Sequence, residues 1–116
     1  MQVTDKLTIT NEDNMALMAR YPDNYFDLAI VDPPYLDDVS GLNVGMNRTF
    51  KYNEFKAPKQ KYFKELIRVS KNQIIWGGNY FTDYLYMNRC WVCWDKVQSG
   101  NFSGFELAWT SFDKVS

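Results

Sequence analysis

The clearest pattern of hydrophobic positions is an unbroken apolar run that ends abruptly. Residues 28–31 read Leu-Ala-Ile-Val, with no polar residue among them. A short run of this kind, partly β-branched, is typical of a strand buried on both faces of a parallel sheet. It ends at Asp32, because Pro33 and Pro34 lack the N–H groups that a sheet requires and disfavour helix in the residue before them. The pattern predicts a buried strand with an acidic residue held at its carboxyl end.

The hydrophobic positions before this run predict one strand and one helix. Residues 6–10 alternate between polar and apolar, as in a short strand. Residues 11–20 carry Met15, Met18 and Ala19 at helical spacing, with Asx residues where a helix cap is expected. We therefore expect Met15 and Met18 to lie in the core.

After the run, the pattern predicts two helices and three strands. Apolar residues recur at helical spacing over residues 58–70, and Pro58 suits the first turn of a helix. Lys71 and Asn72 are expected to turn the chain into a strand over residues 73–76. The remaining expected elements are a short helix over residues 79–87, a strand over residues 90–95, a hairpin connection at residues 98–101 and a strand over residues 105–112.

This order of elements predicts an α/β fold. Strands that alternate with helices form a mostly parallel sheet, and the last two strands add an antiparallel hairpin. No repeat, low-complexity tract or linker divides the chain, so residues 1–116 are interpreted as a single domain. Residues 112–116 carry no helix or cap signal, so we expect this domain to be incomplete.

The composition excludes several classes of protein. With 46% hydrophobic and 23% charged residues the chain is expected to be globular, and no apolar stretch approaches the roughly 18 residues of a membrane span. The first residues have no signal-peptide core, so a cytoplasmic location without membrane contact is predicted. The chain has no histidine, which removes His-based acid–base catalysis and most zinc sites. Cys90 and Cys93 alternate along an expected strand, so we interpret them as core residues and assign no metal site.

Basic residues concentrate between the apolar run and the next strand. The whole chain has a net charge of −1, yet residues 48–71 carry eight basic residues against two acidic ones, a net charge of +6. Such a segment either follows nucleic-acid phosphates or forms an ordinary solvated helix face. It overlaps a loop over residues 36–57, and loops longer than about 12–15 residues are usually functional or disordered. We expect this loop to order over a nucleotide, with Lys51, Lys56 and Lys59 against its phosphates.

Four short motifs resemble those of one enzyme family. Asp32-Pro33-Pro34-Tyr35 follows the apolar run, and three strand motifs come after it: I-I-W-G-G-N-Y-F (74–81), W-V-C-W-D-K (91–96) and F-E-L-A-W-T-S (105–111). In order and spacing they resemble the phage-type S-adenosylmethionine-dependent DNA adenine-N6 methyltransferases, in the subgroup whose permuted motif order places D-P-P-Y near the N-terminus. The resemblance implies a partial Rossmann-like methyltransferase sheet. It also implies methyl transfer to the exocyclic amine of a flipped adenine in DNA.

The motif at the strand end suits chemistry on an exocyclic amine. The lone pair of the adenine amine is delocalised into the ring, and acceptors on its protons help the nitrogen towards a nucleophilic geometry. Asp32 and the backbone carbonyl of Pro33 are the candidate acceptors, and Pro33 and Pro34 hold them rigidly. Tyr35 is the candidate stacking surface for the flipped base. On pattern alone, the same four residues also serve as a strand-terminating turn.

The resemblance assigns further residues around this motif. Asp13 matches a position that borders the adenosine of S-adenosylmethionine, with Asp32 as a second candidate cofactor contact; helix capping is the alternative for Asp13. Trp76 and Asn79 follow another strand end and are candidates for the wall of the base pocket. Buried packing is the alternative for Trp76.

The glycine-rich cofactor loop of the family, of the type F-x-G-x-G, has no counterpart in these residues, and neither has its histidine-containing segment. We therefore expect the catalytic half of the enzyme, inactive without a complementing cofactor-binding segment. The alternatives are a non-catalytic remnant that binds nucleic acid or self-associates, and a methyltransferase of cytosine-N4 or RNA. An exposed edge beside the central strand favours a homodimer, or residues 7–10 filling the gap.

Overall fold

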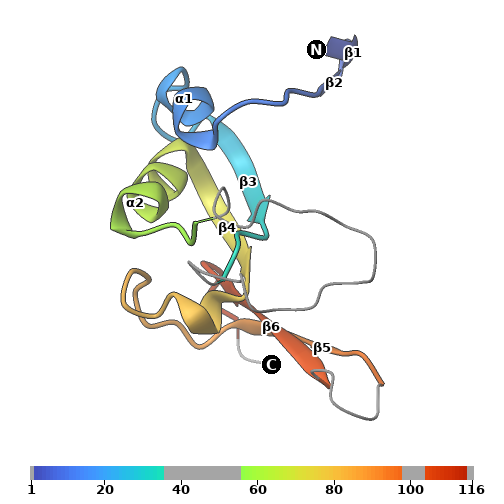
Figure 1. Cartoon of the computed structure of the whole chain (residues 1–116), viewed down its shortest axis with the longest axis vertical. Coiled ribbons are helices and arrows are strands. Elements are labelled where there is room, and N and C mark those ends of the chain that lie inside the picture. The colour runs from blue at the N-terminus through green and yellow to red at the C-terminus, as the bar shows by residue number, and fades with distance from the viewer. Residues whose placement is uncertain (1, 36–55, 98–103, 115–116) are drawn as a thin grey trace.

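The computed structural model describes residues 2–35, 56–97 and 104–114 of the chain (Figure 1). They form an α/β fold around a four-stranded sheet in the order β3-β4-β6-β5. β3 and β4 are parallel, whereas β6 runs antiparallel to both β4 and β5. The predicted terminal hairpin is therefore confirmed, but the sheet of the described residues is mixed rather than mostly parallel. Its strands are β3 (Phe26–Val31), β4 (Ser70–Trp76), β5 (Trp91–Asp95) and β6 (Phe105–Thr110).

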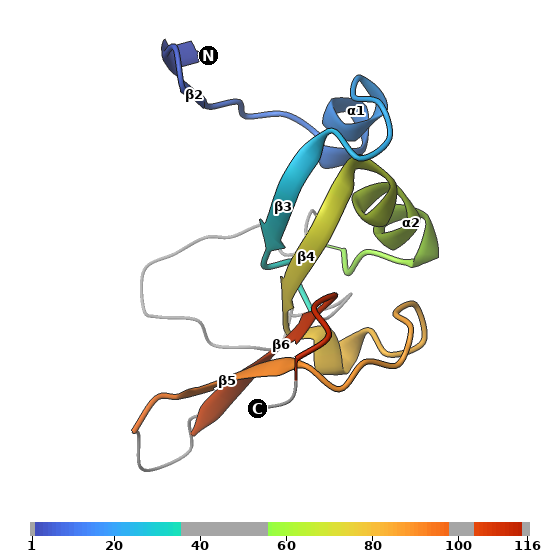
Figure 2. The same cartoon turned by 180° about the vertical axis from the view of Figure 1, so that it is seen from behind.

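Two helices cover one face of the β3–β4 pair, as the two opposite views show (Figures 1 and 2). They are α1 (Asn14–Ala19) and α2 (Gln60–Val69), both shorter than the sequence pattern predicts. α1 begins after Asp13, whose carboxylate accepts a hydrogen bond from the N–H of Ala16 at 3.3 Å. None of the helices in the described residues is long and apolar enough to cross a membrane.

The end of α2 differs from the predicted one. The helix passes directly into β4 at Ser70, which has an extended backbone and donates its hydroxyl to the carbonyl of Leu66 at 2.5 Å. This bond satisfies a helix carbonyl without any connecting loop. Lys71 and Asn72 therefore lie within β4, and the turn predicted there was wrong.

The core lies between the two helices and the sheet. Helix α2 contributes Phe63, Leu66 and Val69, which recur every three residues and form its buried face. Ile75 of β4 and Trp109 of β6 face them and are almost completely buried. The same cluster also includes Met18, Phe81 and Leu85, with Met15 packed against it. The expectation that the two methionines lie in the core is confirmed.

The outer face of β3 is open, contrary to the prediction of a strand buried on both faces. Leu28 is 42% exposed and Ile30 is 61% exposed, whereas Ala29 and Val31 pack against the core. Both described helices lie on one side of the sheet, and β3 has β4 as its single described neighbour. An unbroken apolar run predicts a strand, but it does not reveal whether both sides of that strand are covered.

The N-terminal residues form a small hairpin of their own. β1 (Gln2–Thr4) pairs antiparallel with β2 (Leu7–Thr8), and this hairpin projects away from the sheet (Figure 1). The strand predicted over residues 6–10 is therefore shorter and has a different partner. It does not fill the edge beside β3.

The segment predicted as a helix over residues 79–87 contains only a single 3-10 turn. Helix η2 (Gly78–Tyr80) follows Gly77, whose φ of +70° is left-handed, and the N–H groups of Tyr80 and Phe81 donate to carbonyls three residues earlier. Phe81 and Leu85 are buried, so tertiary packing holds this segment without a regular helix. The strands predicted over residues 90–95 and 105–112 are confirmed as β5 and β6 within one or two residues.

The two cysteines do not lie in the core as predicted. Cys93 is exposed and Cys90 is partly buried, and neither forms a disulfide. The reason is the position of β5, which is the outermost strand of the sheet beyond β6. Cys93 shares a face of β5 with Trp91, which packs against the core, but all residues of β5 after Trp91 are exposed, so alternation alone does not show how far along the strand the core extends.

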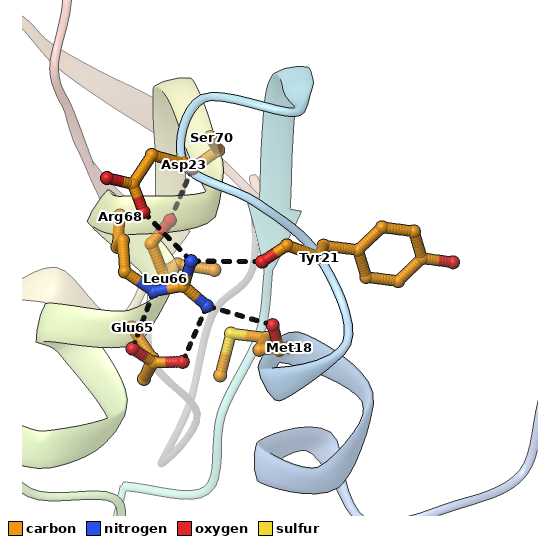
Figure 3. Close-up of polar contacts among 7 residues, drawn as sticks. All are labelled: Met18, Tyr21, Asp23, Glu65, Leu66, Arg68 and Ser70. Carbon is orange, nitrogen blue, oxygen red and sulfur yellow. Dashed lines mark hydrogen bonds and ion pairs between the residues drawn. The ribbon is translucent and has the colours of Figure 1, made fainter.

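Arg68 ties helix α2 to the turn between α1 and β3 (Figure 3). Its guanidinium donates to the Glu65 carboxylate at 2.7 and 2.9 Å and to the Asp23 carboxylate at 3.0 Å. It also donates to the backbone carbonyls of Met18 and Tyr21 at 3.0 and 2.9 Å. The bond to Glu65, and then the bond to Asp23, raise the pKa of Arg68, and the bond from Arg68 lowers the pKa of Glu65. One member of the basic segment is thus a structural residue rather than a phosphate contact.

Candidate functional site

The parallel pairing of β3 and β4 positions the D-P-P-Y motif. Val31 pairs with Ile75, so the two strands end side by side. The chain that leaves β3 therefore meets the chain that leaves β4. The carboxyl ends of parallel strands are where α/β folds usually bind ligands.

Asp32 and Tyr35 are joined in this structure by a hydrogen bond. The Tyr35 hydroxyl donates to Oδ1 of Asp32 at 2.8 Å. Partial burial, and then this bond to a carboxylate, raise the pKa of Tyr35 well above its usual range. Pro33 is buried and Pro34 is exposed. The hydrogen bond spans these two prolines and keeps the exposed carboxylate and the tyrosine at the same end of the sheet. The tyrosine side chain thus orients the acid.

Gly77 allows the close approach between the two strand ends. A Cβ placed on Gly77 would lie 2.0 Å from Cε1 of Tyr35, well inside contact distance. Its φ of +70° is also a conformation that side chains rarely adopt. Only glycine therefore lets the Tyr35 ring pack against the backbone after β4. The first glycine of the sequence motif G-G-N-Y-F is thus required for the contact with Tyr35.

The ring of Tyr35 is part of an aromatic cluster. It stacks on Tyr80, with ring centroids 4.8 Å apart and planes inclined by 19°. The Phe81 ring meets it edge-on at 6.3 Å. Tyr80 is 59% exposed and belongs to η2, while Phe81 is buried. The predicted stacking surface thus already has an aromatic partner from the other strand end.

A pocket of about 360 Å³ opens beside this tyrosine pair. Asn79, predicted as part of the base pocket, lines it, and so does Tyr35. Glu106, at the start of β6, contributes a carboxylate to the lining of this pocket and forms an ion pair with Lys96 of the hairpin. The Lys96 ammonium also lies 5.4 Å from the ring centroid of Trp94. The remaining lining residues are Gly77, Tyr80, Phe105 and Leu107.

A second pocket, of about 330 Å³, lies on the other side of the two prolines. Asp13 and Lys56 line it together with Pro33 and Pro34, so residues predicted for cofactor, phosphate and base meet here. Asn14, Pro58 and Tyr62 complete its lining. Burial raises the pKa of Tyr62 to about 12. The alternative role of Asp13 as the cap of α1 is confirmed, whereas its contact with a cofactor stays a prediction.

The structure separates the other predicted residues from these pockets. Trp76 lines neither of the two; its ring packs edge-on against Trp94 with centroids 6.2 Å apart. Lys59 is exposed at the start of α2 and also lines neither pocket. Lys51, most of the loop predicted over residues 36–57 and the hairpin connection at residues 98–101 lie outside the described residues. In the described part of the chain no cluster of His, Cys, Asp or Glu could hold a metal ion.

The pocket residues that were not predicted from the sequence include Tyr80, Glu106 and Tyr62. Tyr80 stands in the G-G-N-Y-F motif, one residue after Asn79, so the motif itself carried a signal for it. Glu106 is a polar residue at the start of an otherwise apolar strand, which is a weak signal. Nothing in the spacing of Tyr62 distinguishes it from the other apolar positions of α2.

Comparison of the chain with known protein families, with curated proteins and with solved structures found no match.

Proposed function

We propose that this chain carries the target-base half of an S-adenosylmethionine-dependent DNA adenine-N6 methyltransferase. The observation that carries the proposal is the Asp32 carboxylate at the end of β3, held by the Tyr35 hydroxyl beside a pocket lined by Asn79. It is supported by the resemblance of four motifs in order and spacing. The parallel β3–β4 pair and the antiparallel β5–β6 hairpin are compatible with part of a Rossmann-like methyltransferase sheet.

The proposed chemistry uses Asp32 and the carbonyl of Pro33 as acceptors for the two protons of the amine. A carboxylate has two oxygens with several lone pairs, so it can accept from Tyr35 at Oδ1 and also from the base. The consecutive prolines restrict the backbone, which keeps both acceptors aimed at one point before the base arrives. Accepting these hydrogen bonds favours the positive charge that develops on nitrogen as methyl transfer begins.

S-adenosylmethionine supplies an electrophilic methyl group when it is bound. The pocket lined by Asp13, Lys56 and the prolines fits an adenosine, since it offers one carboxylate for ribose hydroxyls and apolar surface for a ring. Tyr62 adds an aromatic wall to it. The methionine moiety has no such counterpart among the described residues, in agreement with the missing G-x-G sequence. We therefore propose that activity depends on a complementing glycine-rich segment.

The proposal is tested by methyl transfer from isotopically labelled S-adenosylmethionine. The substrates are duplex DNA, adenine-free DNA and RNA, and cofactor binding is measured separately by calorimetry. With a glycine-rich segment added in trans, we expect label at adenine N6 and at least a hundredfold loss in Asp32→Asn, as roughly expected when a preorganised electrostatic contact is removed. Asp83→Asn, an exposed carboxylate outside both pockets, is the control.

The outcomes separate this proposal from its alternatives. Label in adenine-free DNA would indicate cytosine-N4 methylation, and label in RNA would indicate a different substrate. If the chain binds DNA but transfers no methyl group even with a glycine-rich segment added in trans, the non-catalytic binding module replaces the enzyme. The exposed apolar residues of β3 favour self-association in that second case.

The proposed DNA contacts of Lys51, Lys56 and Lys59 are tested by salt titration. For each phosphate that the protein no longer neutralises, the slope of log affinity against log salt should fall by about 0.9 for duplex DNA. We expect this fall for the glutamine variants of the three lysines. Lys6→Gln, in the N-terminal hairpin, should keep the original slope. An unchanged slope in all variants would remove these contacts from the proposal.

A further inference from the structure

Tyr35 and Tyr80 form a nearly parallel ring pair at the ends of β3 and β4. Their centroids are 4.8 Å apart, and the planes are inclined by 19°. A stack of this kind between a partly buried ring and a largely exposed one leaves the exposed ring with few other restraints. Tyr80 is 59% exposed and sits in a 3-10 turn of three residues.

The position of Asp32 determines which end of this pair matters. The Tyr35 hydroxyl donates to Asp32, so an aromatic ring lying on Tyr35 brings its edge towards the carboxylate. The backbone of Gly77 lies against the Cδ1, Cε1 and Cζ atoms of the Tyr35 ring, so close that a Cβ on residue 77 would collide with them. The stacking position on Tyr35 is held in this structure by Tyr80. A base that stacks on the face of Tyr35 that Tyr80 covers must therefore displace the Tyr80 ring outwards.

We propose that the target base inserts between Tyr35 and Tyr80, so that Tyr80 is a second stacking surface and a substrate-binding residue. The inference rests on the proposed function, since the ligand is the base that presents its amine to Asp32. Insertion widens the separation of the two rings to roughly 7 Å, two aromatic contacts of about 3.5 Å each. Tyr80 borders the pocket of about 360 Å³, which gives its ring room to move.

The charge of that pocket favours a base over a phosphate. Glu106 places a carboxylate in its wall, and Asn79 offers an amide that both donates and accepts. The ion pair with Lys96 holds the Glu106 carboxylate in place. The Lys96 ammonium and this carboxylate neutralise each other, so the described lining offers a phosphate no excess positive charge, whereas the edge of a purine finds hydrogen-bonding partners. The ligand class is therefore an unstacked nucleobase, best a purine with an amine.

The test uses the fluorescence of 2-aminopurine, which falls when the base stacks on an aromatic ring. The probe is a single-stranded thymine 12-mer with one central 2-aminopurine, and the reference is the same oligonucleotide with an abasic site at that position. We expect Tyr80→Ala to weaken binding of the probe by about 5-fold to 100-fold, the usual effect of removing one base–aromatic stack, and to reduce the quenching to the part that Tyr35 contributes. Binding of the abasic reference should change by less than about twofold.

Two variants control for folding and for general effects of tyrosine. Tyr80→Phe keeps the ring and should bind and quench as the original chain does, which would exclude a role for the hydroxyl. Tyr25→Ala removes an exposed tyrosine that contacts Tyr21 and Phe26 at the opposite end of β3, and should change nothing. Circular dichroism spectra of all variants are compared with that of the original chain.

The inference is overturned if Tyr80→Ala quenches and binds the probe unchanged, or if the original chain binds the probe and the abasic reference equally. It is also overturned if Tyr80→Phe loses as much affinity as Tyr80→Ala. The assay needs no methyl donor, so its result is independent of methyl transfer. Quenching through Tyr80 in a chain that methylates nothing even with a glycine-rich segment added in trans would refute the proposed function and retain the stacking role of Tyr80.

Discussion

Three contacts hold the side chain of Tyr35 in place. Its hydroxyl is bonded to Asp32, its ring stacks on Tyr80, and the backbone of Gly77 packs against its side. The bond to Asp32 is local, whereas the contacts with Tyr80 and Gly77 depend on the parallel pairing of β3 with β4. The tyrosine is thus a positioning residue for Asp32 as well as a candidate stacking surface.

Replacing Gly77 by alanine tests the close contact with Tyr35. The new Cβ would collide with the Tyr35 ring and would require a left-handed backbone, which costs about 1–3 kcal/mol for a residue other than glycine. We expect Gly77→Ala to lower the free energy of unfolding by at least that amount, measured by urea denaturation. Gly104→Ala is the matched control, because nothing lies within 4 Å of its added Cβ. Equal stability of the two variants would contradict the contact.

The raised pKa of Tyr62 predicts how stability changes at high pH. Burial raises the pKa of this tyrosine to about 12, whereas an unfolded tyrosine ionises near pH 10. The folded state therefore holds the proton more tightly, and this contribution to stability is complete below about pH 10 and lost as the pH rises towards 12. We expect the urea midpoint to fall in that window and Tyr62→Phe to flatten the fall. Because the pKa of Tyr35 is raised as well, part of the slope should remain.

The control for the Tyr62 titration is a substitution at an exposed residue. Met87→Leu changes a residue that is 98% exposed and has no ionisable group, and should leave the pH dependence of the urea midpoint as it was. A Tyr62→Phe variant with the original slope would mean that this side chain is not buried in solution.

At the level of the elements, Arg68 explains how a short α1 is held against α2. α1 has only six residues, too few for a stable isolated helix, so its position depends on tertiary contacts. The guanidinium of Arg68 accounts for several of them, because it bonds the carbonyls of Met18 and Tyr21 at and after the helix end. The Met18 carbonyl also accepts from the N–H of Tyr21 at 3.2 Å, so Arg68 adds a second donor there.

Arg68→Lys and Arg68→Ala together test whether the planar guanidinium of Arg68, rather than its charge alone, stabilises the contact between α1 and α2. Lysine keeps the charge but has no planar fork, so it cannot bond two carboxylates and two carbonyls at once. We expect both variants to lower the urea midpoint, with alanine the worse of the two. The control is Arg20→Ala, which removes an ion pair of the exposed Glu12. If Arg68→Lys behaves like the original chain, the fork geometry is unimportant.

The whole molecule has helices on one side of its sheet in the described residues and an apolar strand open on the other. Leu28 and Ile30 of β3 are exposed there, and β3 is an edge strand of the sheet in the described residues. Exposed apolar edges favour pairing with another chain. The expected homodimer thus remains a prediction, while the proposed filling of the gap by residues 7–10 does not occur in this structure.

A lysine on β3 tests this prediction of self-association. We expect the original chain to sediment as a larger species at higher concentration and Ile30→Lys to shift it towards the monomer, with a change in stability within about 0.5 kcal/mol. Met87→Lys, at a residue that is 98% exposed, should have no effect. A monodisperse monomer at every concentration would contradict the prediction.

Local patterns were sufficient for most elements and for the position of the motif. The apolar run of residues 28–31, the amphipathic spacing of α2 and the alternation of β5 and β6 are local signals, and each element was found near its expected place. The two prolines after Asp32 stop β3 whatever surrounds it, because proline has no N–H to donate. Asp32, Pro33 and Tyr35 could therefore be placed at a strand end from the sequence.

Burial and partnership depended on the folded chain. The exposure of Leu28, Ile30 and Cys93 follows from which strands lie at the edges of the sheet, and no local window contains that information. The same holds for the direct passage from α2 into β4 at Ser70. Tyr80 and Glu106 reach the pocket because β4 pairs with both β3 and β6, and such pairing joins residues far apart in sequence. Local pattern thus specifies where a strand ends, whereas long-range pairing specifies what that end faces.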